Sequence, residues 1–235
     1  MGEVAANWQI VQERVNIAAA RAGRDSQEIR IIAVGKTVSV ERIKEAVEAG
    51  VTDLGENRVQ EAREKIGILG RGPRWHLIGH LQRNKAKYIF DLFDMVHSVD
   101  SLALAREIDH EGRKRGRKME VLVQVNLGEE DTKSGLDPSK VLPALQETAS
   151  LSSLSIRGLM SIPPFFSDPE EVRPFFKQLR QLAQEIAGRK IPGVSLQELS
   201  MGMSHDFEVA VEEGATMIRV GTAIFGSRAS KGYPR

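Results

Sequence analysis

Val121-Leu-Val-Gln-Val125 is a short, nearly continuous apolar stretch, and similar stretches recur along the whole chain. Parallel strands that are buried on both faces need this near-continuous apolar character. Segments with helical spacing, such as Val40–Ala49 and Arg58–Leu69, separate the stretches. Eight alternations of strand and helix predict an α/β fold, a single (βα)8 barrel of the TIM type. The eight expected strands lie at residues 30–35, 52–55, 75–79, 94–98, 119–126, 155–160, 195–199 and 216–220.

The length of 235 residues is within the range of one such barrel. Trp8, Val11, Val15 and Ala18 recur at helical spacing, so residues 1–23 are expected to form an extra N-terminal helix outside the barrel. No linker-like composition divides the chain, and residues 227–235 are expected to form a short tail. We therefore expect one domain over residues 1–235.

Charge and composition exclude several classes of protein. The 33 Lys and Arg residues nearly balance the 32 Asp and Glu residues, so the net charge of +1 gives no reason to expect binding to nucleic acid or to a membrane. The chain has no Cys, which excludes disulfides and fits a reducing compartment. No stretch approaches the roughly 18 to 20 apolar residues of a membrane span, and the N-terminus does not resemble a secretion signal. We expect a cytoplasmic monomer.

Lys36 directly follows the apolar stretch Arg30-Ile-Ile-Ala-Val-Gly35, at the end of the first expected strand. The carboxyl ends of the strands carry the working site in barrels of this type. A desolvated Lys shifts toward the neutral amine, which can form a Schiff base with a carbonyl compound. The alternative is a Lys just beyond the strand, with its amine in water.

Two loops suggest a phosphate site, because this fold often holds phosphate after its seventh and eighth strands. Leu199-Ser-Met-Gly-Met-Ser204 offers hydroxyl donors and the flexible Gly202. Gly221 allows a close backbone approach, and Thr222 can begin a short helix with free N–H groups. Either loop alone would be read as ordinary turn chemistry, but the two together favour a phosphate site.

Arg219 lies inside the last expected strand and should point to the face opposite Ile218 and Val220. A buried Arg requires an acceptor. That acceptor is either an acidic side chain, such as Glu198 or Glu56, or the ring nitrogen of a ligand.

His76 and His80 are four residues apart, a spacing that binds zinc when both lie on one face of a helix. Here the stretch Trp75–Gly79 is read as a strand, and no further cluster supplies ligands. We predict no metal site.

The chain resembles the pyridoxal 5'-phosphate homeostasis protein family, and the resemblance covers nearly all of its length. The matching motifs occur in order and lie at strand ends. The family fold is the single barrel related to the N-terminal domain of alanine racemases and ornithine-type decarboxylases, which are fold-type III pyridoxal phosphate proteins. The motifs are Ala33-Val-Gly-Lys36, Leu54-Gly-Glu-Asn-Arg58, Trp75-His-Leu-Ile-Gly79, Leu81-Gln-Arg-Asn-Lys85, Lys133-Ser-Gly135, Arg157-Gly-Leu-Met160, Leu199-Ser-Met-Gly-Met-Ser204 and Ile218-Arg-Val-Gly-Thr222.

The resemblance implies that Lys36 forms a Schiff base with pyridoxal 5'-phosphate. It implies no catalytic residue. Because Arg keeps its proton, a ring nitrogen that faces Arg219 should stay unprotonated, and this weakens the ring as an electron sink. The other implied cofactor-binding residues are Asn57 near the ring, Ser200, Gly221 and Thr222 at the phosphate, and Arg219 at the pyridine nitrogen.

Three functions compete. The first is a binding protein that carries the cofactor on Lys36 for intracellular storage and delivery to cofactor-free enzymes, without turnover of its own. The second is a pyridoxal phosphate-dependent amino-acid racemase or decarboxylase. The third is a phosphosugar enzyme in which Lys36 attacks a substrate carbonyl. Arg219 argues against the third, because a sugar phosphate has no ring nitrogen.

The length of the chain favours the first function over the second. The expected strands extend through Val220, so little chain remains for the additional domain of related racemases and decarboxylases. Tyr88 is expected in a helix and Tyr233 in the tail, so neither phenol is placed as an acid or base.

Overall fold

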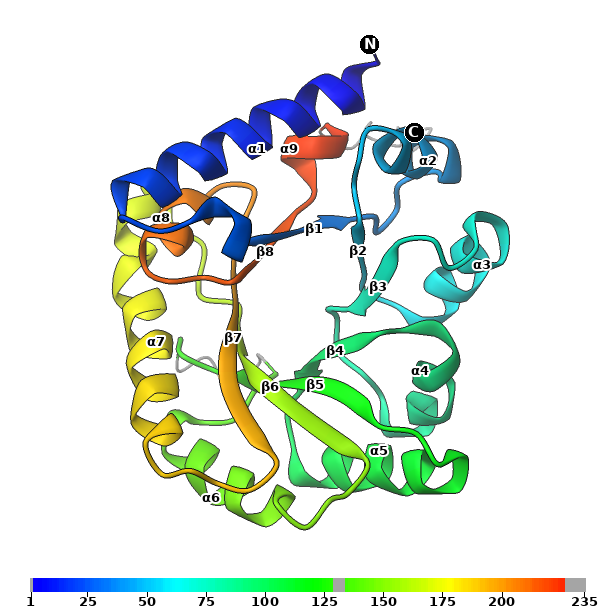
Figure 1. The fold of residues 1–235 in the computed structure, drawn as a ribbon, viewed down its shortest axis with the longest axis vertical. Helices are drawn as coiled ribbons and strands as arrows, with labels where there is room; N and C mark the ends of the chain where they lie inside the picture. Colours follow the sequence, from blue (N-terminus) through cyan, green and yellow to red (C-terminus); the bar gives the residue numbers. More distant parts are fainter. Residues whose placement is uncertain (1, 129–133, 227–235) are drawn as a thin grey trace, which may run out of the picture.

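Eight parallel strands form the centre of the molecule, and each pairs with its neighbours in chain order until β8 closes against β1 (Figure 1). The computed structural model describes residues 2–128 and 134–226. Lys133 and the expected tail at 227–235 lie outside these residues. The strands are β1 (Arg30–Val34), β2 (Asp53–Glu56), β3 (Arg74–Leu77), β4 (Met95–Val99), β5 (Met119–Val125), β6 (Leu154–Ser161), β7 (Val194–Met203) and β8 (Met217–Val220).

Helices surround the barrel, and the predicted TIM-type fold with an extra N-terminal helix is confirmed. Short 3-10 turns, η1 (Ser26–Glu28), η2 (Arg83–Lys85) and η3 (Pro169–Val172), lie in the connections. The helices are α1 (Glu3–Arg21), α2 (Val40–Glu48), α3 (Val59–Leu69), α4 (Ala86–Leu92), α5 (Leu102–Arg115), α6 (Pro138–Thr148), α7 (Arg173–Ala187), α8 (Phe207–Glu212) and α9 (Thr222–Phe225).

Local side chains define where several helices begin and end. Ser101 Oγ accepts the Leu104 N–H at 3.3 Å and so caps α5 directly after β4. The carboxylate of Asp137 accepts the Ser139 N–H at 2.8 Å at the start of α6. Gly116 ends α5 with a φ of 59°, a conformation that glycine adopts without steric cost.

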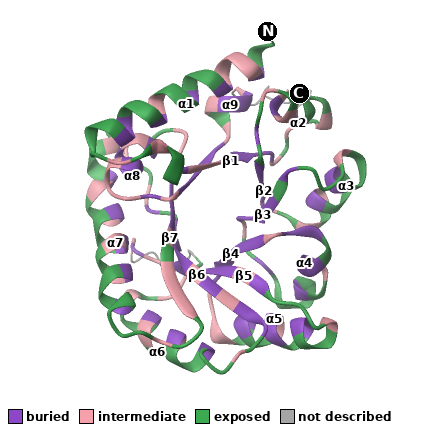
Figure 2. Cartoon of the chain, viewed as in Figure 1, coloured by how far each residue is buried: buried purple, intermediate pink, exposed green. Residues whose placement is uncertain are grey.

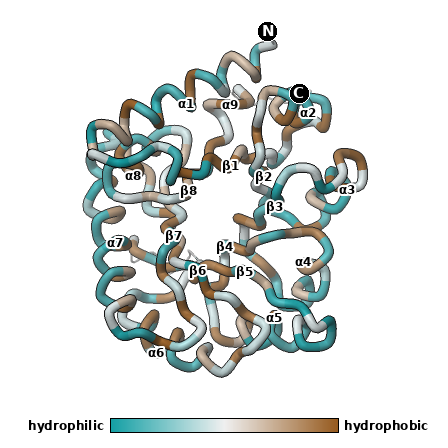
Figure 3. The backbone as a smooth tube through the Cα atoms, in the orientation of Figure 1, coloured by the Kyte–Doolittle hydropathy of each residue, from teal (hydrophilic) through white to brown (hydrophobic). Residues whose placement is uncertain are grey.

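The main hydrophobic core lies between the outer faces of the strands and the helices. Helix surfaces toward the barrel are buried and apolar, whereas the outer surfaces are exposed and more polar (Figures 2 and 3). The helix α1 packs along α8 and α9 through its buried residues, which include Val4, Val11 and Val15. Within the described ranges, no helix is both long enough and apolar enough to cross a membrane.

The barrel interior is filled by two kinds of side chain. A small apolar cluster occupies part of it, as is usual for this fold. Buried polar side chains, among them His76, His97, Ser200 and Arg219, occupy another part. The apolar cluster consists of Ile32, Met95, Leu122, Met160 and Met217.

Strand β7 is longer than expected, since it runs to Met203 rather than to residue 199. The Ser-Met-Gly-Met stretch has the composition of a loop, which explains the short prediction. In the structure the pairing of β7 with β8 shifts register between Ser200 and Met203, and Gly202 has a φ of +89°. A Cβ at Gly202 would lie 2.5 Å from the side chain of Ala210. Backbone conformation and packing therefore account for this glycine, and Ser200 belongs to the strand.

Candidate functional site

Lys36 lies directly after β1, at the carboxyl end of the barrel. Its side chain lines a cavity of about 300 Å³ that Gly221 and Thr222 also line, together with Ser39 and Arg42. In the part of the chain that the structure describes, no group forms a hydrogen bond or ion pair with the Lys36 amine. Two of the predicted elements, the lysine and the loop after the eighth strand, therefore share one cavity.

The turn that carries Lys36 is tight and strained. Thr37 has a φ of 62°, which is uncommon for a β-branched residue. A Cβ at Gly35 would come within 2.8 Å of a Glu56 carboxylate oxygen, so a larger residue here would displace this buried carboxylate. The Val38 N–H donates to the Gly35 carbonyl at 2.9 Å and closes the turn. Strained backbone of this kind is common at binding sites.

A buried lysine on α3 supports this turn. Lys65 Nζ donates to the Gly35 carbonyl at 2.6 Å, to Glu56 at 2.8 Å and to Glu61 at 2.6 Å. Glu61 also accepts the Thr37 N–H at 2.6 Å. Burial raises the pKa of Glu56 to about 7, although the hydrogen bond from Lys65 acts in the opposite direction. These contacts connect both sides of the Lys36 turn to one ion-pair cluster, defined here as the Lys65 cluster (Lys65, Glu56 and Glu61).

Lys65 is not among the residues that the sequence motifs identify. The available signal is its position on the buried face of α3 with Ala62 and Ile66, four residues after Glu61. A lysine on an apolar helix face needs a partner, and an acidic residue one turn earlier provides one.

Gly221 and Thr222 lie at the junction of β8 and α9, as expected. The N–H groups of Gly221 and Ala223 both donate to Ser204 Oγ, at 3.1 and 3.3 Å. A Cβ at Gly221 would make only ordinary contact with Val34, at 3.5 Å, and its φ is −112°. The described surroundings therefore do not require glycine at this position. Its open face fits the close approach of an anion.

Ser200 is not part of this loop cluster. Its hydroxyl is fully buried inside the barrel, 2.9 Å from His97 Nδ1 and 2.6 Å from an Arg219 nitrogen. The hydroxyl that the structure brings to Gly221 belongs to Ser204, the last residue of the stretch identified in the sequence. The register of β7 explains why Ser204, rather than Ser200, lies beside Gly221. The extended strand places Ser200 in the interior and Ser204 at the rim of the barrel.

Arg219 points into the barrel and is only 4% exposed. Its guanidinium donates to Ser200 Oγ at 2.6 Å and to the Ser161 carbonyl at 2.8 Å. Neither expected acidic partner reaches it, because Glu198 accepts from Thr216 and Glu56 belongs to the Lys65 cluster. Among the described residues, no carboxylate forms an ion pair with Arg219.

Electrostatics agree with this isolation of the Arg219 charge. Burial lowers the pKa of Arg219 to about 10, and the carboxylate of Asp206 partly opposes this shift through space. A buried cation without an adjacent anion is costly. The guanidinium therefore favours an acceptor supplied by a ligand.

Asn57 lies at the same end of the barrel but lines a neighbouring cavity of about 440 Å³ with Gly79, His80 and Lys85. A Cβ at Gly79 would lie 2.4 Å from the Asn57 carbonyl oxygen, so glycine lets the ends of β2 and β3 approach closely. The structure does not bring Asn57 into the cavity that Lys36 lines.

His76 and His80 have different surroundings. His76 lies inside the barrel beside Asp53 and His97, whereas His80 is exposed and pairs with Asp100 at 3.0 Å. Within residues 2–128 and 134–226, no three acidic or His side chains form a group that could hold a metal ion.

The chain matches the family model of the alanine racemase N-terminal domain over residues 4–229. It is 43% identical over 219 residues to the pyridoxal phosphate homeostasis protein of Aquifex aeolicus, covering 93% of this chain and 95% of that protein. The structure of PipY from Synechococcus elongatus with pyridoxal phosphate bound is similar with a TM-score of 0.81 and 41% identity, covering 92% of this chain and all of that one.

An alanine racemase from Clostridium difficile shares the fold, with a TM-score of 0.71 at 16% identity. This likeness covers 97% of the present chain and 57% of the racemase. The chain belongs to the alanine racemase N-terminal domain family and, within it, to the pyridoxal phosphate homeostasis proteins.

Proposed function

We propose that this protein binds pyridoxal 5'-phosphate as a Schiff base on Lys36 and serves the storage and delivery of the cofactor. The observation that carries the proposal is the shared cavity of the Lys36 amine and the Gly221–Thr222 loop. In the Schiff base, Nζ of Lys36 bonds to the aldehyde carbon, and the carbonyl oxygen leaves as water. The bound form of PipY and the names of the relatives support this choice of cofactor.

The remaining groups fit the same cofactor. The N–H groups of Gly221 and Ala223 both donate to Ser204 Oγ. These N–H groups, the Ser204 hydroxyl and Thr222 form the proposed phosphate contacts, with a phosphate oxygen taking the place of Oγ as acceptor of the two N–H groups. In this assignment Ser204 takes the place that the resemblance gave to Ser200. Asn57 is retained as a pocket residue near the ring, at the edge of the neighbouring cavity.

Arg219 is the proposed partner of the pyridine nitrogen. A guanidinium has only N–H donors, so the ring nitrogen must act as the acceptor and stay unprotonated. A protein that keeps the ring in this state weakens its ability to stabilise a carbanion. Arg219 therefore supports a carrier without turnover over a racemase or decarboxylase.

The lysine, the phosphate donors and the guanidinium all come from one chain. We therefore propose that a monomer holds the cofactor, and we propose the cytoplasm as its location. Delivery requires that the Schiff base be reversible: water can hydrolyse it to the free aldehyde, or a competing amine can take over the aldehyde carbon in a new Schiff base, and either step returns Lys36 as a free amine. We propose cofactor-free pyridoxal phosphate enzymes as the recipients.

The test is a transfer experiment with the purified, loaded protein. Mixed with a cofactor-free pyridoxal phosphate enzyme, it should restore that enzyme's activity while its own visible absorbance falls. Incubated with alanine, serine or ornithine, it should neither racemise nor decarboxylate them above the rate of free cofactor. Sustained formation of D-amino acid or amine, lost in Lys36→Ala, would instead establish a single-barrel enzyme.

A further inference from the structure

A continuous chain of hydrogen-bonded side chains crosses the interior of the barrel. Arg219 on β8 donates to Ser200 on β7 at 2.6 Å, and Ser200 Oγ lies 2.9 Å from His97 Nδ1 on β4. His97 Nε2 lies 3.0 Å from His76 Nδ1 on β3, and His76 Nε2 lies 2.9 Å from the Asp53 carboxylate on β2. All five side chains are buried. These residues are called the interior chain below.

The hydrogen atoms of the interior chain can point in only one direction. Burial lowers the pKa of His76 and lowers that of His97 much further, so both imidazoles are neutral. Burial alone would raise the pKa of Asp53, but hydrogen bonds from His76 and Thr52 outweigh it and keep the carboxylate ionised. An ionised carboxylate only accepts and a guanidinium only donates. Each imidazole must therefore carry its proton on Nε2, and the Ser200 hydroxyl must donate to His97.

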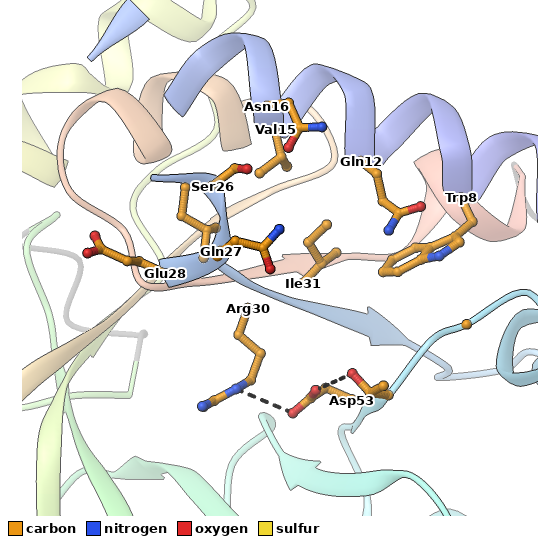
Figure 4. A pocket seen from close by; sticks show the side chains of 13 residues that line it. Trp8, Gln12, Val15, Asn16, Ser26, Gln27, Glu28, Arg30, Ile31 and Asp53 are labelled. Carbon is orange, nitrogen blue, oxygen red and sulfur yellow. Dashed lines mark hydrogen bonds and ion pairs between the residues drawn. The ribbon is translucent and has the colours of Figure 1, made fainter. Parts of the chain in front are cut away.

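Asp53 fixes the far end of the interior chain. It lies at the amino end of β2 and also accepts the Thr52 hydroxyl at 2.8 Å. Arg30 extends away from α1 toward Asp53, with its Nε 3.6 Å from the carboxylate (Figure 4). The carboxylate is thus held by several groups, whereas the guanidinium at the other end has no ion-pair partner among the described residues.

A purely structural explanation is that these groups only satisfy one another inside the core. The apolar residues of the adjacent cluster show what normally fills this space. Five polar side chains in place of such residues need a compensating role, because desolvated polar groups are stabilising only when every partner is correctly placed. Arg219, at one end of the interior chain, lies on β8 two residues before Gly221, which lines the cavity of Lys36.

We infer that the interior chain positions the Arg219 guanidinium for the ring nitrogen of the cofactor, and that Ser200, His97, His76 and Asp53 are positioning residues for this contact. The inference rests on the proposed function. The Ser200 hydroxyl accepts a hydrogen bond from Arg219 and donates one to His97. The orientation of the guanidinium therefore depends on an acceptor at position 97. The ionised Asp53 fixes the orientation of that acceptor through His76.

The test compares two ligands in the intact protein: pyridoxal 5'-phosphate and its 1-deaza analogue, in which a CH group replaces the ring nitrogen. His97→Leu removes the acceptor for Ser200. It should weaken binding of pyridoxal phosphate by about tenfold or more, the scale of one charge-assisted hydrogen bond. Binding of the analogue should change much less, because the analogue offers Arg219 no acceptor.

Two further variants separate positioning from folding. The amide of His97→Gln can accept from Ser200 and donate to His76, so this variant should recover most of the affinity for pyridoxal phosphate. Met95→Leu is the matched control, since Met95 lies on the same strand in the apolar cluster of the interior. It should affect the two ligands equally.

A spectroscopic measurement on the ligand-free protein independently checks the direction of the hydrogen bonds in the interior chain. Nitrogen NMR of the imidazole side chains should find His76 and His97 neutral, each with its proton on Nε2. A charged His97, or one with its proton on Nδ1, would overturn the inference.

The binding outcomes are distinguishable. Equal losses for both ligands in His97→Leu would overturn the inference and leave the interior chain as a structural element. Unchanged affinity for pyridoxal phosphate in this variant would overturn it as well. Failure of the unaltered protein to bind pyridoxal phosphate at all would instead refute the proposed function.

Discussion

Among the described residues the protein buries two cations, Lys65 and Arg219, and their surroundings differ. Lys65 is surrounded by Glu56, Glu61 and the carbonyl of Gly35, all within 2.8 Å of its amine. Arg219 contacts a hydroxyl and a carbonyl but, among the described residues, no carboxylate at ion-pair distance. The charge of Lys65 is thus compensated within the protein. The charge of Arg219 is not compensated in this way and is available to an acceptor on a ligand. This difference distinguishes a cation that stabilises the fold from a cation that binds a ligand.

The two cations should respond differently to removal. Lys65→Met leaves two carboxylates without their partner in a buried site, and breaking such a pair costs about 3 to 5 kcal/mol of the free energy of unfolding. Arg219→Leu removes a cation that was already without an adjacent anion, so the loss of stability should be smaller while the affinity for pyridoxal phosphate falls. Urea unfolding of the ligand-free variants and equilibrium titration measure the two effects. Similar losses of stability in both variants would contradict the comparison.

The phosphate contacts give a second, smaller contrast between two serines. Ser204→Ala should weaken the binding of pyridoxal phosphate by about 1.5 to 3 kcal/mol, the contribution of one charge-assisted hydrogen bond. The binding of pyridoxal, which has no phosphate, should be nearly unaffected. Ser200→Ala interrupts the interior chain instead, so it should weaken the binding of pyridoxal phosphate and of pyridoxal to the same extent. Titration of each variant with both ligands distinguishes the roles. A phosphate-specific loss in Ser200→Ala would return the phosphate contact to Ser200.

The Lys65 cluster also predicts a dependence of stability on pH. The pKa of Glu56 is raised from 4.5 to about 7, so the folded protein binds this proton more tightly than the unfolded chain. The stability that this group contributes is present below pH 4.5 and is lost as the pH rises toward 7. Relative to Glu56→Gln, the unaltered protein should lose up to about 1.4 kcal/mol per pH unit across this window.

Urea unfolding of the unaltered protein and of Glu56→Gln between about pH 5 and pH 8 measures this slope. Glu61→Gln is the control, because the pKa of Glu61 is lowered despite its partial burial, through hydrogen bonds from Lys65 and the Thr37 N–H. Its difference from the unaltered protein should slope less steeply over the same range, because Glu61 acts there only through its charge beside Glu56. A flat difference for Glu56→Gln would show that this carboxyl is already ionised at pH 5.

Much of the fold followed from local patterns. Apolar stretches located the strands because a barrel of parallel strands buries both faces of each one. The alternation of side chains along the last strand predicted that Arg219 points to the face opposite Ile218, which is the interior of the barrel. The sequence alone predicted that Lys36 follows the first strand, where this fold carries its sites, and the structure places it there beside a cavity.

The parts that escaped prediction depend on contacts between distant residues. The irregular register between β7 and β8, which moves Ser200 into the barrel and Ser204 to the rim, is not visible in composition. The contact of His97 with Ser200 joins residues 103 positions apart and exists only after the barrel closes. Lys65 carried a helical signal, but its role required knowledge of where the Lys36 turn lies.

The most direct test of the account is to locate the covalent attachment. Borohydride reduction of the protein loaded with pyridoxal phosphate converts the C=N bond to a stable amine, and peptide mapping by mass spectrometry identifies the modified lysine. We expect one pyridoxyl adduct, on the peptide that contains Lys36, and a colourless Lys36→Ala variant. An adduct found only on another lysine, such as Lys65 or Lys133, or a variant that remains yellow, would contradict attachment of the cofactor at Lys36.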